Sequence, residues 1–123
     1  GYCTAFPELP YEIAVALLTR VISKPGKDLF CVDCGYKAIA SEMPLENRLA
    51  VLGLDNVKIV SHSEEHMVLE SPEANQLRIG QPLLTQPRHI FPTRALSEKV
   101  ATMRSGEVSS ERWSVTARNR LGI

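Results

Sequence analysis

Apolar residues occur in short runs separated by polar or turn-forming residues, a pattern that predicts a series of strands. Ile13–Ser23 is apolar with a β-branched pair near its end, which favours a strand closed by a turn at Lys24–Lys27. The stretch 77–84 is interrupted by glycine and proline, which predicts an edge strand or two short pieces. Further strands are expected at 29–32, 57–60 and 67–69, with a candidate continuation at 36–40.

The last third of the chain has the pattern of a hairpin. Lys99–Met103 and Val108–Val115 are strand-like and flank a glycine-containing turn at Arg104–Glu107. The polar segments 41–48 and 71–75 contain proline and are expected to be loops. Many short strands with frequent turns predict a mainly β domain, either a barrel or a sandwich.

Composition narrows the class of protein. The chain has 123 residues, 44% of them apolar, which suits one domain with one core. Lysine plus arginine and aspartate plus glutamate number 14 each, so no basic stripe argues for a nucleic-acid partner. The longest apolar run, Ile13–Leu18, is too short to span a bilayer, and no basic region precedes it. We therefore expect a soluble, cytoplasmic protein that has no membrane partner.

Three cysteines are present, and two of them form a CxxC pattern. Cys31 and Cys34 fit either a redox pair or half of a zinc site, but no second ligand pair follows, and Cys3 is isolated. A redox pair begins a helix, whereas Leu29–Asp33 has the character of a strand. Residues three apart on a strand face opposite sides, so buried, unreactive cysteines are the favoured interpretation.

The segment His62–His66 matches the inverted zincin pattern HxxEH. That chemistry needs both histidines on one face of a helix, with the glutamate acting on a metal-bound water. The flanking residues favour strands, which predicts a polar turn. A metalloprotease remains the alternative only if 62–66 is helical.

Four blocks of the sequence, taken in order, resemble the C-terminal domain of D-threonine aldolases and eukaryotic-type D-serine dehydratases. They are Val32–Ala38 (VDCGYKA), Ser63–His66 (SEEH), Pro87–Thr93 (PRHIFPT), and the stretch from Met103 through Trp113 to Arg120. Each block is weak alone, but their order spans about three quarters of the chain.

The resemblance implies a small β-barrel-like domain akin to the C-terminal domain of alanine racemases. In that family the domain caps an N-terminal (β/α)₈ barrel that binds pyridoxal phosphate, and the enzyme is a homodimer. Residues 1–12 would then be the connection from the missing barrel, and 13–123 the C-terminal β-domain. None of the lysines is expected to form a Schiff base with the cofactor (Lys24, Lys27, Lys37, Lys58 and Lys99).

The family's metal ligands fall at His89 and at the position two residues later, where this chain has Phe91 in place of cysteine or aspartate. Phenylalanine has no lone pair, so we expect His89 to mark the site without holding a divalent ion tightly. If residues 89–91 form a strand, both side chains share a face. A second, smaller departure is Asn119, in place of the family's terminal glycine.

Glu65 and His66 are the other residues expected to face the active site. The resemblance implies the cap and metal-site domain of a pyridoxal-phosphate-dependent lyase acting on D-β-hydroxy-amino acids, inactive as the isolated chain. The alternative is a non-catalytic β-module that binds a partner protein or a small ligand.

Overall fold

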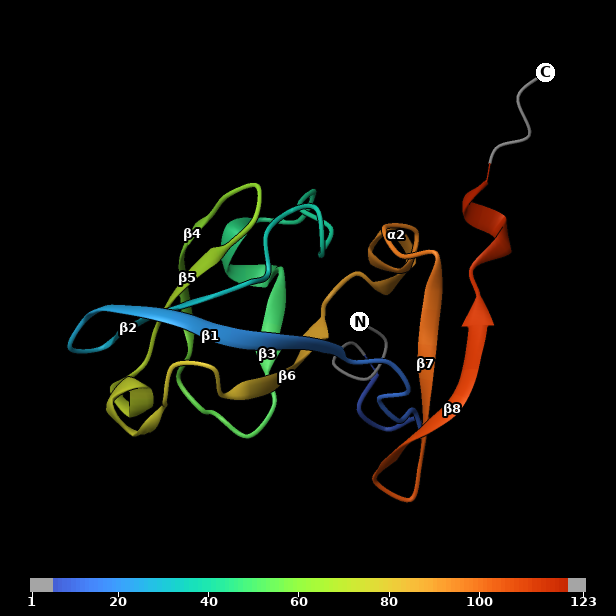
Figure 1. Ribbon diagram of the computed structural model, residues 1–123, viewed down its shortest axis with the longest axis horizontal. Coiled ribbons are helices and arrows are strands. Elements are labelled where there is room, and N and C mark those ends of the chain that lie inside the picture. Colours follow the sequence, from blue (N-terminus) through green and yellow to red (C-terminus); the bar gives the residue numbers. More distant parts are fainter. Residues whose placement is uncertain (1–5, 120–123) are drawn as a thin grey trace.

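The computed structural model describes residues 6–119, which form two antiparallel sheets (Figure 1). A six-stranded sheet has the order β3-β6-β1-β2-β5-β4, and a separate two-stranded sheet pairs β7 with β8. The strands are β1 (Leu17–Gly26), β2 (Leu29–Val32), β3 (Leu49–Val51), β4 (Lys58–His62), β5 (Met67–Glu70), β6 (Pro82–Pro87), β7 (Lys99–Arg104) and β8 (Glu107–Ser114). The helical pieces are short: η1 (Leu45–Asn47), η2 (Pro72–Gln76), α2 (Ile90–Arg94) and η3 (Thr116–Arg118).

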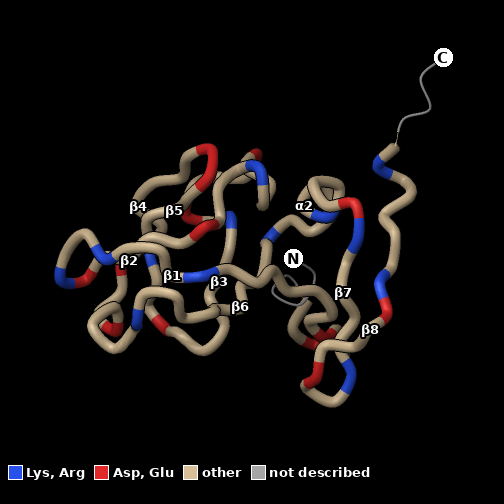
Figure 2. Tube along the Cα trace, in the orientation of Figure 1, with Lys and Arg blue, Asp and Glu red and all other residues tan. Residues whose placement is uncertain are grey.

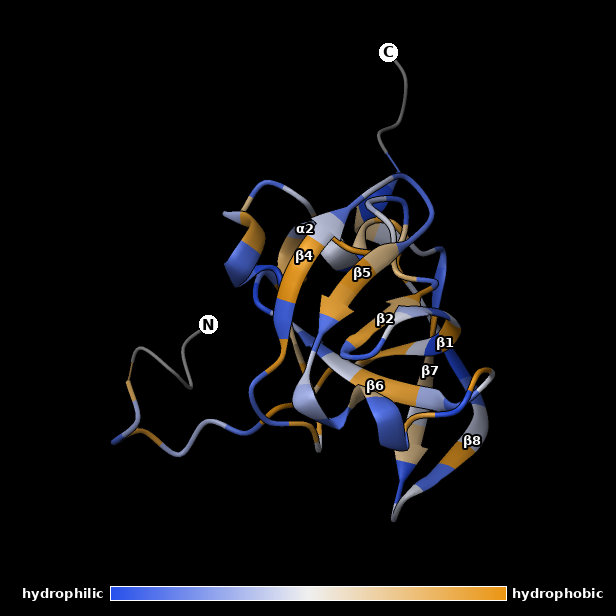
Figure 3. Ribbon diagram, turned by 90° about the vertical axis from the view of Figure 1, so that its left-hand side faces the viewer, coloured by the Kyte–Doolittle hydropathy of each residue, from blue (hydrophilic) through white to orange (hydrophobic). Residues whose placement is uncertain are grey.

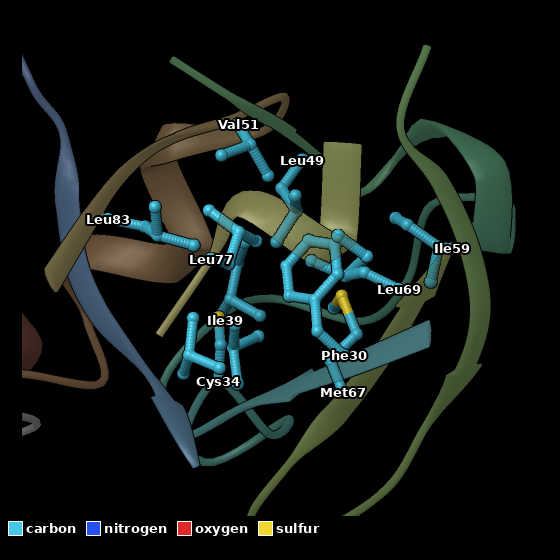
Figure 4. Close-up of a cluster of buried hydrophobic side chains, with 13 residues drawn as sticks. Phe30, Cys34, Ile39, Leu49, Val51, Ile59, Met67, Leu69, Leu77 and Leu83 are labelled. Atoms are coloured by element: carbon cyan, nitrogen blue, oxygen red, sulfur yellow. The ribbon is translucent and has the colours of Figure 1, made fainter. Parts of the chain in front are cut away.

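The larger sheet curls around the apolar core, as a half-barrel, because the alternate residues of its strands face one side. In β1 this inward set includes Thr19 and Val21, each 1% exposed, while the intervening residues are exposed. Phe30, Met67 and Leu69 are fully buried at the centre of the core (Figure 4). Colouring by hydropathy shows apolar residues along β4, β5, β2 and β6 (Figure 3). The mainly β prediction is confirmed.

Several expected elements are displaced. β1 begins four residues later than predicted and continues through Lys24–Gly26, so the turn falls at residues 27 and 28. Irregular pairing with β2 accommodates this extension. The predicted continuation at 36–40 is wrong, because the chain turns there. β3 was not predicted, since three residues carry too little pattern.

The edge-strand prediction for 77–84 is also wrong. β6 begins only at Pro82 and lies between β3 and β1, inside the sheet. Its two prolines, Pro82 and Pro87, are its first and last residues. Because proline removes a backbone donor, these end positions let a proline-flanked strand lie in the middle of a sheet.

The predicted hairpin is confirmed. β7 and β8 are joined by Ser105 and Gly106, whose φ angles of 50° and 83° are both positive, as a tight two-residue hairpin turn requires. Met103, Val108 and Trp113 are more than half exposed on it. In Figure 1 the hairpin lies to one side of the curled sheet. It therefore contributes no residue to the buried core.

Candidate functional site

The first two family-like blocks interlock through their backbones. An added Cβ at Gly35 would lie 2.0 Å from the carbonyl oxygen of Glu64, so only glycine fits there. The Tyr36 N–H donates to the Ser63 carbonyl at 3.0 Å, and the Lys37 N–H donates to the Glu64 carbonyl at 3.3 Å. The glycine of the first block is therefore what positions the turn of the second.

Charges on the same two blocks also pair. Lys37 Nζ lies 2.7 Å from a carboxylate oxygen of Glu64 and 2.7 Å from one of Glu65. These hydrogen bonds raise the pKa of Lys37, first through Glu64 and then through Glu65. All three side chains are more than half exposed, so the two ion pairs lie in solvent and contribute little to stability.

The segment 62–66 is a turn, as predicted, because β4 ends at His62 and β5 begins at Met67. The Ser63 N–H donates to the His66 carbonyl at 2.9 Å, and Ser63 Oγ lies 3.1 Å from His66 Nδ1. The inverted zincin pattern therefore lacks the helix that its chemistry needs.

The two histidines of this segment have different partners: the ring of His62 contacts a cation, whereas that of His66 contacts a hydroxyl. Arg48 Nη1 donates to His62 Nδ1 at 2.8 Å, and Tyr36 packs against the ring edge-on with centroids 5.9 Å apart. Burial is the main cause that lowers the pKa of His62, and the positive charge of Arg48 lowers it further. The backbone of Gly35 has the opposite, smaller effect, because it stabilises the charged ring. The neutral ring thus serves as an acceptor for Arg48.

His89 lies immediately before α2, and Glu42 from the loop 41–48 is its partner. His89 Nδ1 and Glu42 Oε1 form a short hydrogen-bond contact. The pKa of Glu42 is lowered, chiefly by a hydrogen bond from its own backbone and further by His89. Thr93 Oγ1 donates to the His89 carbonyl at 2.8 Å and accepts from the Ala40 N–H at 3.2 Å. One buried hydroxyl therefore fastens the loop and the helix start together.

The expected strand geometry at 89–91 is wrong. His89 has extended dihedral angles, but Phe91 is the second residue of α2, so the two side chains do not share a strand face. Phe91 is 67% exposed, and the Arg94 guanidinium lies 4.8 Å from its ring centroid. Pro92 stands in the first helical turn, where proline is tolerated because the backbone N–H groups there have no acceptor within the helix.

The side chains of the segment 89–94 do not form a set of ligands for a divalent ion. Phe91 provides no lone pair, and Arg94 places a positive charge over its ring. Across residues 6–119, no three side chains of His, Cys, Asp or Glu lie close enough together to hold a metal. Glu65 and His66 contact Lys37 and Ser63, whereas the carboxylate that reaches His89 is that of Glu42.

The CxxC cysteines are free and buried. Burial raises the pKa of Cys34 to about 12, and the neighbouring Asp33 charge acts in the same direction. Such a thiol is unreactive, in agreement with the buried interpretation. Asp33 Oδ1 accepts two hydrogen bonds, one from Thr19 Oγ1 at 2.5 Å and one from the Arg20 N–H at 2.6 Å. Cys3 lies outside the described residues.

The structure shows partners for three of the lysines. Lys37 and Lys58 pair with carboxylates at the surface, and Lys24 donates to the Leu77 carbonyl at 2.9 Å. None of the five lysines within 6–119 is buried.

Sequence reasoning missed Glu42, Arg48, Thr93 and Arg94 as parts of these clusters. Glu42 and Arg48 belong to a polar segment that looked like a plain surface loop. Their partners lie 47 and 14 residues away, and no local pattern encodes such contacts. Thr93 did stand inside a family-like block, which was its only signal.

Charged residues are distributed over the whole molecule without a single-sign face (Figure 2). This distribution agrees with the equal totals of acidic and basic residues. Over the part of the chain that the structure describes, no helix has the length and apolar character to cross a membrane.

Curated relatives include two aldolases. The chain is 33% identical over 112 residues to 3-hydroxy-D-aspartate aldolase of Paracoccus denitrificans, a match that covers 89% of this chain and 27% of that enzyme. D-Threonine aldolase of an Arthrobacter species is 29% identical over 111 residues, with 89% and 28% covered. The chain thus spans little more than a quarter of the length of these relatives.

A third relative is short. An uncharacterized protein of Mycobacterium tuberculosis is 27% identical over 118 residues, and the match covers 90% of this chain and 88% of that protein. A domain of this kind therefore also occurs in a protein of similar length.

Solved structures share the architecture. D-Threonine aldolase from Filomicrobium marinum superposes with a TM-score of 0.78 at 25% identity, covering 89% of this chain and 29% of that one. An alanine-racemase-like protein from Idiomarina loihiensis gives a TM-score of 0.64 at 22% identity, covering 80% and 30%. The expected likeness to alanine-racemase-type domains is thereby confirmed.

The family described as the putative serine dehydratase domain matches residues 14–103, well over half of the sequence. That range includes the residues whose contacts are described above, from Gly35 against Glu64 to His89 beside Glu42. The chain belongs to the putative serine dehydratase domain family.

Proposed function

We propose that this chain is the cap domain of a pyridoxal-phosphate-dependent lyase that acts on D-β-hydroxy-amino acids. The supporting observation is the match to 3-hydroxy-D-aspartate aldolase, which runs along 89% of this chain but only 27% of the enzyme. The remainder of such an enzyme would be a (β/α)₈ barrel, in the same or a partner subunit of a homodimer. The barrel would hold the cofactor, which acts as the electron sink of the reaction.

In this arrangement the domain closes the active site rather than performing the covalent step. Its contribution would come from the turn 63–66 and from His89, which it holds in defined conformations beside the substrate. Enclosure excludes water and orients the reacting groups, and these effects account for a large share of enzymatic rate enhancement.

The test is to isolate the native protein that contains this sequence and to record its intact mass, its absorbance spectrum and its activity on 3-hydroxy-D-aspartate and D-threonine. We expect a polypeptide or complex larger than 13.6 kDa and a cofactor band. Aldol cleavage should give glycine together with an aldehyde, which is glyoxylate from 3-hydroxy-D-aspartate and acetaldehyde from D-threonine. The 123-residue chain alone serves as the control and should show neither band nor turnover. A native protein of that mass, without cofactor or activity, would overturn the proposal.

A second function is a non-catalytic β-module that binds a partner protein or a small ligand. It is favoured by the short Mycobacterium tuberculosis relative, of which this chain covers 88%. Pull-down of a stable partner by the native protein, in the absence of any cofactor band, would support this function over the enzyme.

A further inference from the structure

The Glu42–His89 pair is built into the fold. The two residues are 47 positions apart, and Thr93 holds both segments with one hydroxyl: it donates to the His89 carbonyl and accepts from the Ala40 N–H. Thr93 is 4% exposed, so these hydrogen bonds are shielded from water. The backbone segments that carry Glu42 and His89 are therefore joined independently of the contact between the two side chains.

The loop that carries Glu42 is also tied at its other end. Arg48 Nε donates to the Met43 carbonyl at 2.9 Å, and Arg48 Nη1 donates to His62 at 2.8 Å. The Arg88 N–H donates to the Arg48 carbonyl at 3.0 Å, next to His89 in the chain. Both ends of the loop thus contact elements of the folded domain, which restricts where the Glu42 carboxylate can lie.

The pairing distinguishes the two nitrogens of the imidazole. A carboxylate only accepts hydrogen bonds, so the nitrogen that faces Glu42 must carry the hydrogen. In a neutral ring that leaves Nε2 with its lone pair free, and the His89 side chain is 49% exposed. The domain therefore presents a fixed hydrogen-bond acceptor at this position.

The segment that carries His89 supplies no second ligand for a divalent ion. Phe91 offers no ligand atom, and the Arg94 guanidinium lies 4.8 Å from the centroid of its ring.

We propose that Glu42 is a positioning residue that fixes His89 with its hydrogen on Nδ1, so that Nε2 accepts a hydrogen bond without a divalent ion. The identity of the group that donates to Nε2 rests on the proposed function: it is the β-hydroxyl of the D-amino acid. The assignment of the ring nitrogens stands apart from that function, because it is a property of the chain alone.

The test is a long-range ¹H–¹⁵N spectrum of the histidine rings in the full chain at pH 9, where an ordinary imidazole is neutral. We expect the hydrogen of His89 on Nδ1 in the wild type. Glu42→Ala should lose this preference, whereas Glu42→Gln should keep it, because the amide oxygen still accepts from Nδ1. Glu46→Ala, in η1 of the same loop, is the matched control and should leave the spectrum of His89 unchanged.

Two kinds of result would overturn the proposal, one in the spectra and one in metal binding. One is a wild-type His89 with its hydrogen on Nε2, or a Glu42→Ala spectrum identical to that of the wild type. The other is saturable binding of zinc or manganese chloride in calorimetry that disappears in His89→Ala. Neither result depends on pyridoxal phosphate or on turnover, so a failure here is distinguishable from a failure of the proposed function.

Discussion

The turn Ser63–His66 and the segment His89–Thr93 both belong to blocks that resemble the family's site, yet they are held in different ways. The turn is positioned by backbone contacts with Gly35 and its neighbours. The segment is positioned by side chains, Glu42 and Thr93. Backbone contacts tolerate changes in the side chains that they carry, whereas a side-chain contact ends with one substitution. The turn should therefore keep its conformation when its side chains change, whereas the segment depends on two particular side chains.

The largest effect is expected from Gly35→Ala. Its Cβ would overlap the backbone of Glu64 at 2.0 Å, which a side-chain rotation cannot relieve. We expect a loss of about 3 kcal/mol or more in the free energy of unfolding, in the range of severe overpacking. Urea denaturation followed by circular dichroism measures it. Gly26→Ala is the control, since its Cβ meets only the Leu29 side chain at 3.4 Å. Equal effects of the two substitutions would contradict the interlock.

Thr93→Val tests the side-chain attachment. It keeps the shape but removes the donor to His89 and the acceptor for Ala40, both shielded from water. A loss of about 1–3 kcal/mol is expected, because two backbone groups lose their partner. Thr93→Ser should restore most of it. If Thr93→Val were as stable as the wild type, the hydroxyl would not be what joins the loop to α2.

Acid should loosen the contact between His62 and Arg48. Burial lowers the pKa of His62 in the folded protein relative to the unfolded chain, so the unfolded chain binds its proton first as the pH falls. Stability from this group is complete above an unfolded-state pKa of about 6.5 and is lost as the pH falls through the lower folded-state value. Urea titrations between pH 7.5 and 4.5 should show a shallower decline for His62→Gln than for the wild type. Parallel curves for the variant and the wild type would refute the prediction.

The smallest effect belongs to Lys37→Met. Its two ion pairs are exposed and screened by salt, so the turn should keep its place through the Gly35 contact alone. Thermal unfolding at low and high sodium chloride should give nearly the same midpoint for variant and wild type, with any difference confined to low salt. A large loss of stability at both salt concentrations would mean that charge, rather than backbone, positions the turn.

Sequence reasoning reached the local features and missed the distant ones. Hydropathy alternation and turn residues located β2, β5 and the hairpin, because those signals lie within a few residues of the elements that they specify. The central position of β6 was missed, since proline suggests an edge unless it stands at a strand end. The Glu42–His89 contact joins segments 47 residues apart through a loop without periodicity, so only the folded chain reveals it.

Trp113 is the chain's single tryptophan, and it is 58% exposed on the hairpin, remote from the buried core. Intrinsic fluorescence of this protein therefore reports on a two-stranded ribbon rather than on the core, and two such strands alone are marginally stable. On heating, the change in tryptophan fluorescence should occur at a lower temperature than the loss of the far-ultraviolet circular dichroism signal. The same indole provides a label-free sensor of assembly: a barrel or second subunit that covers the hairpin would shift its emission to shorter wavelength.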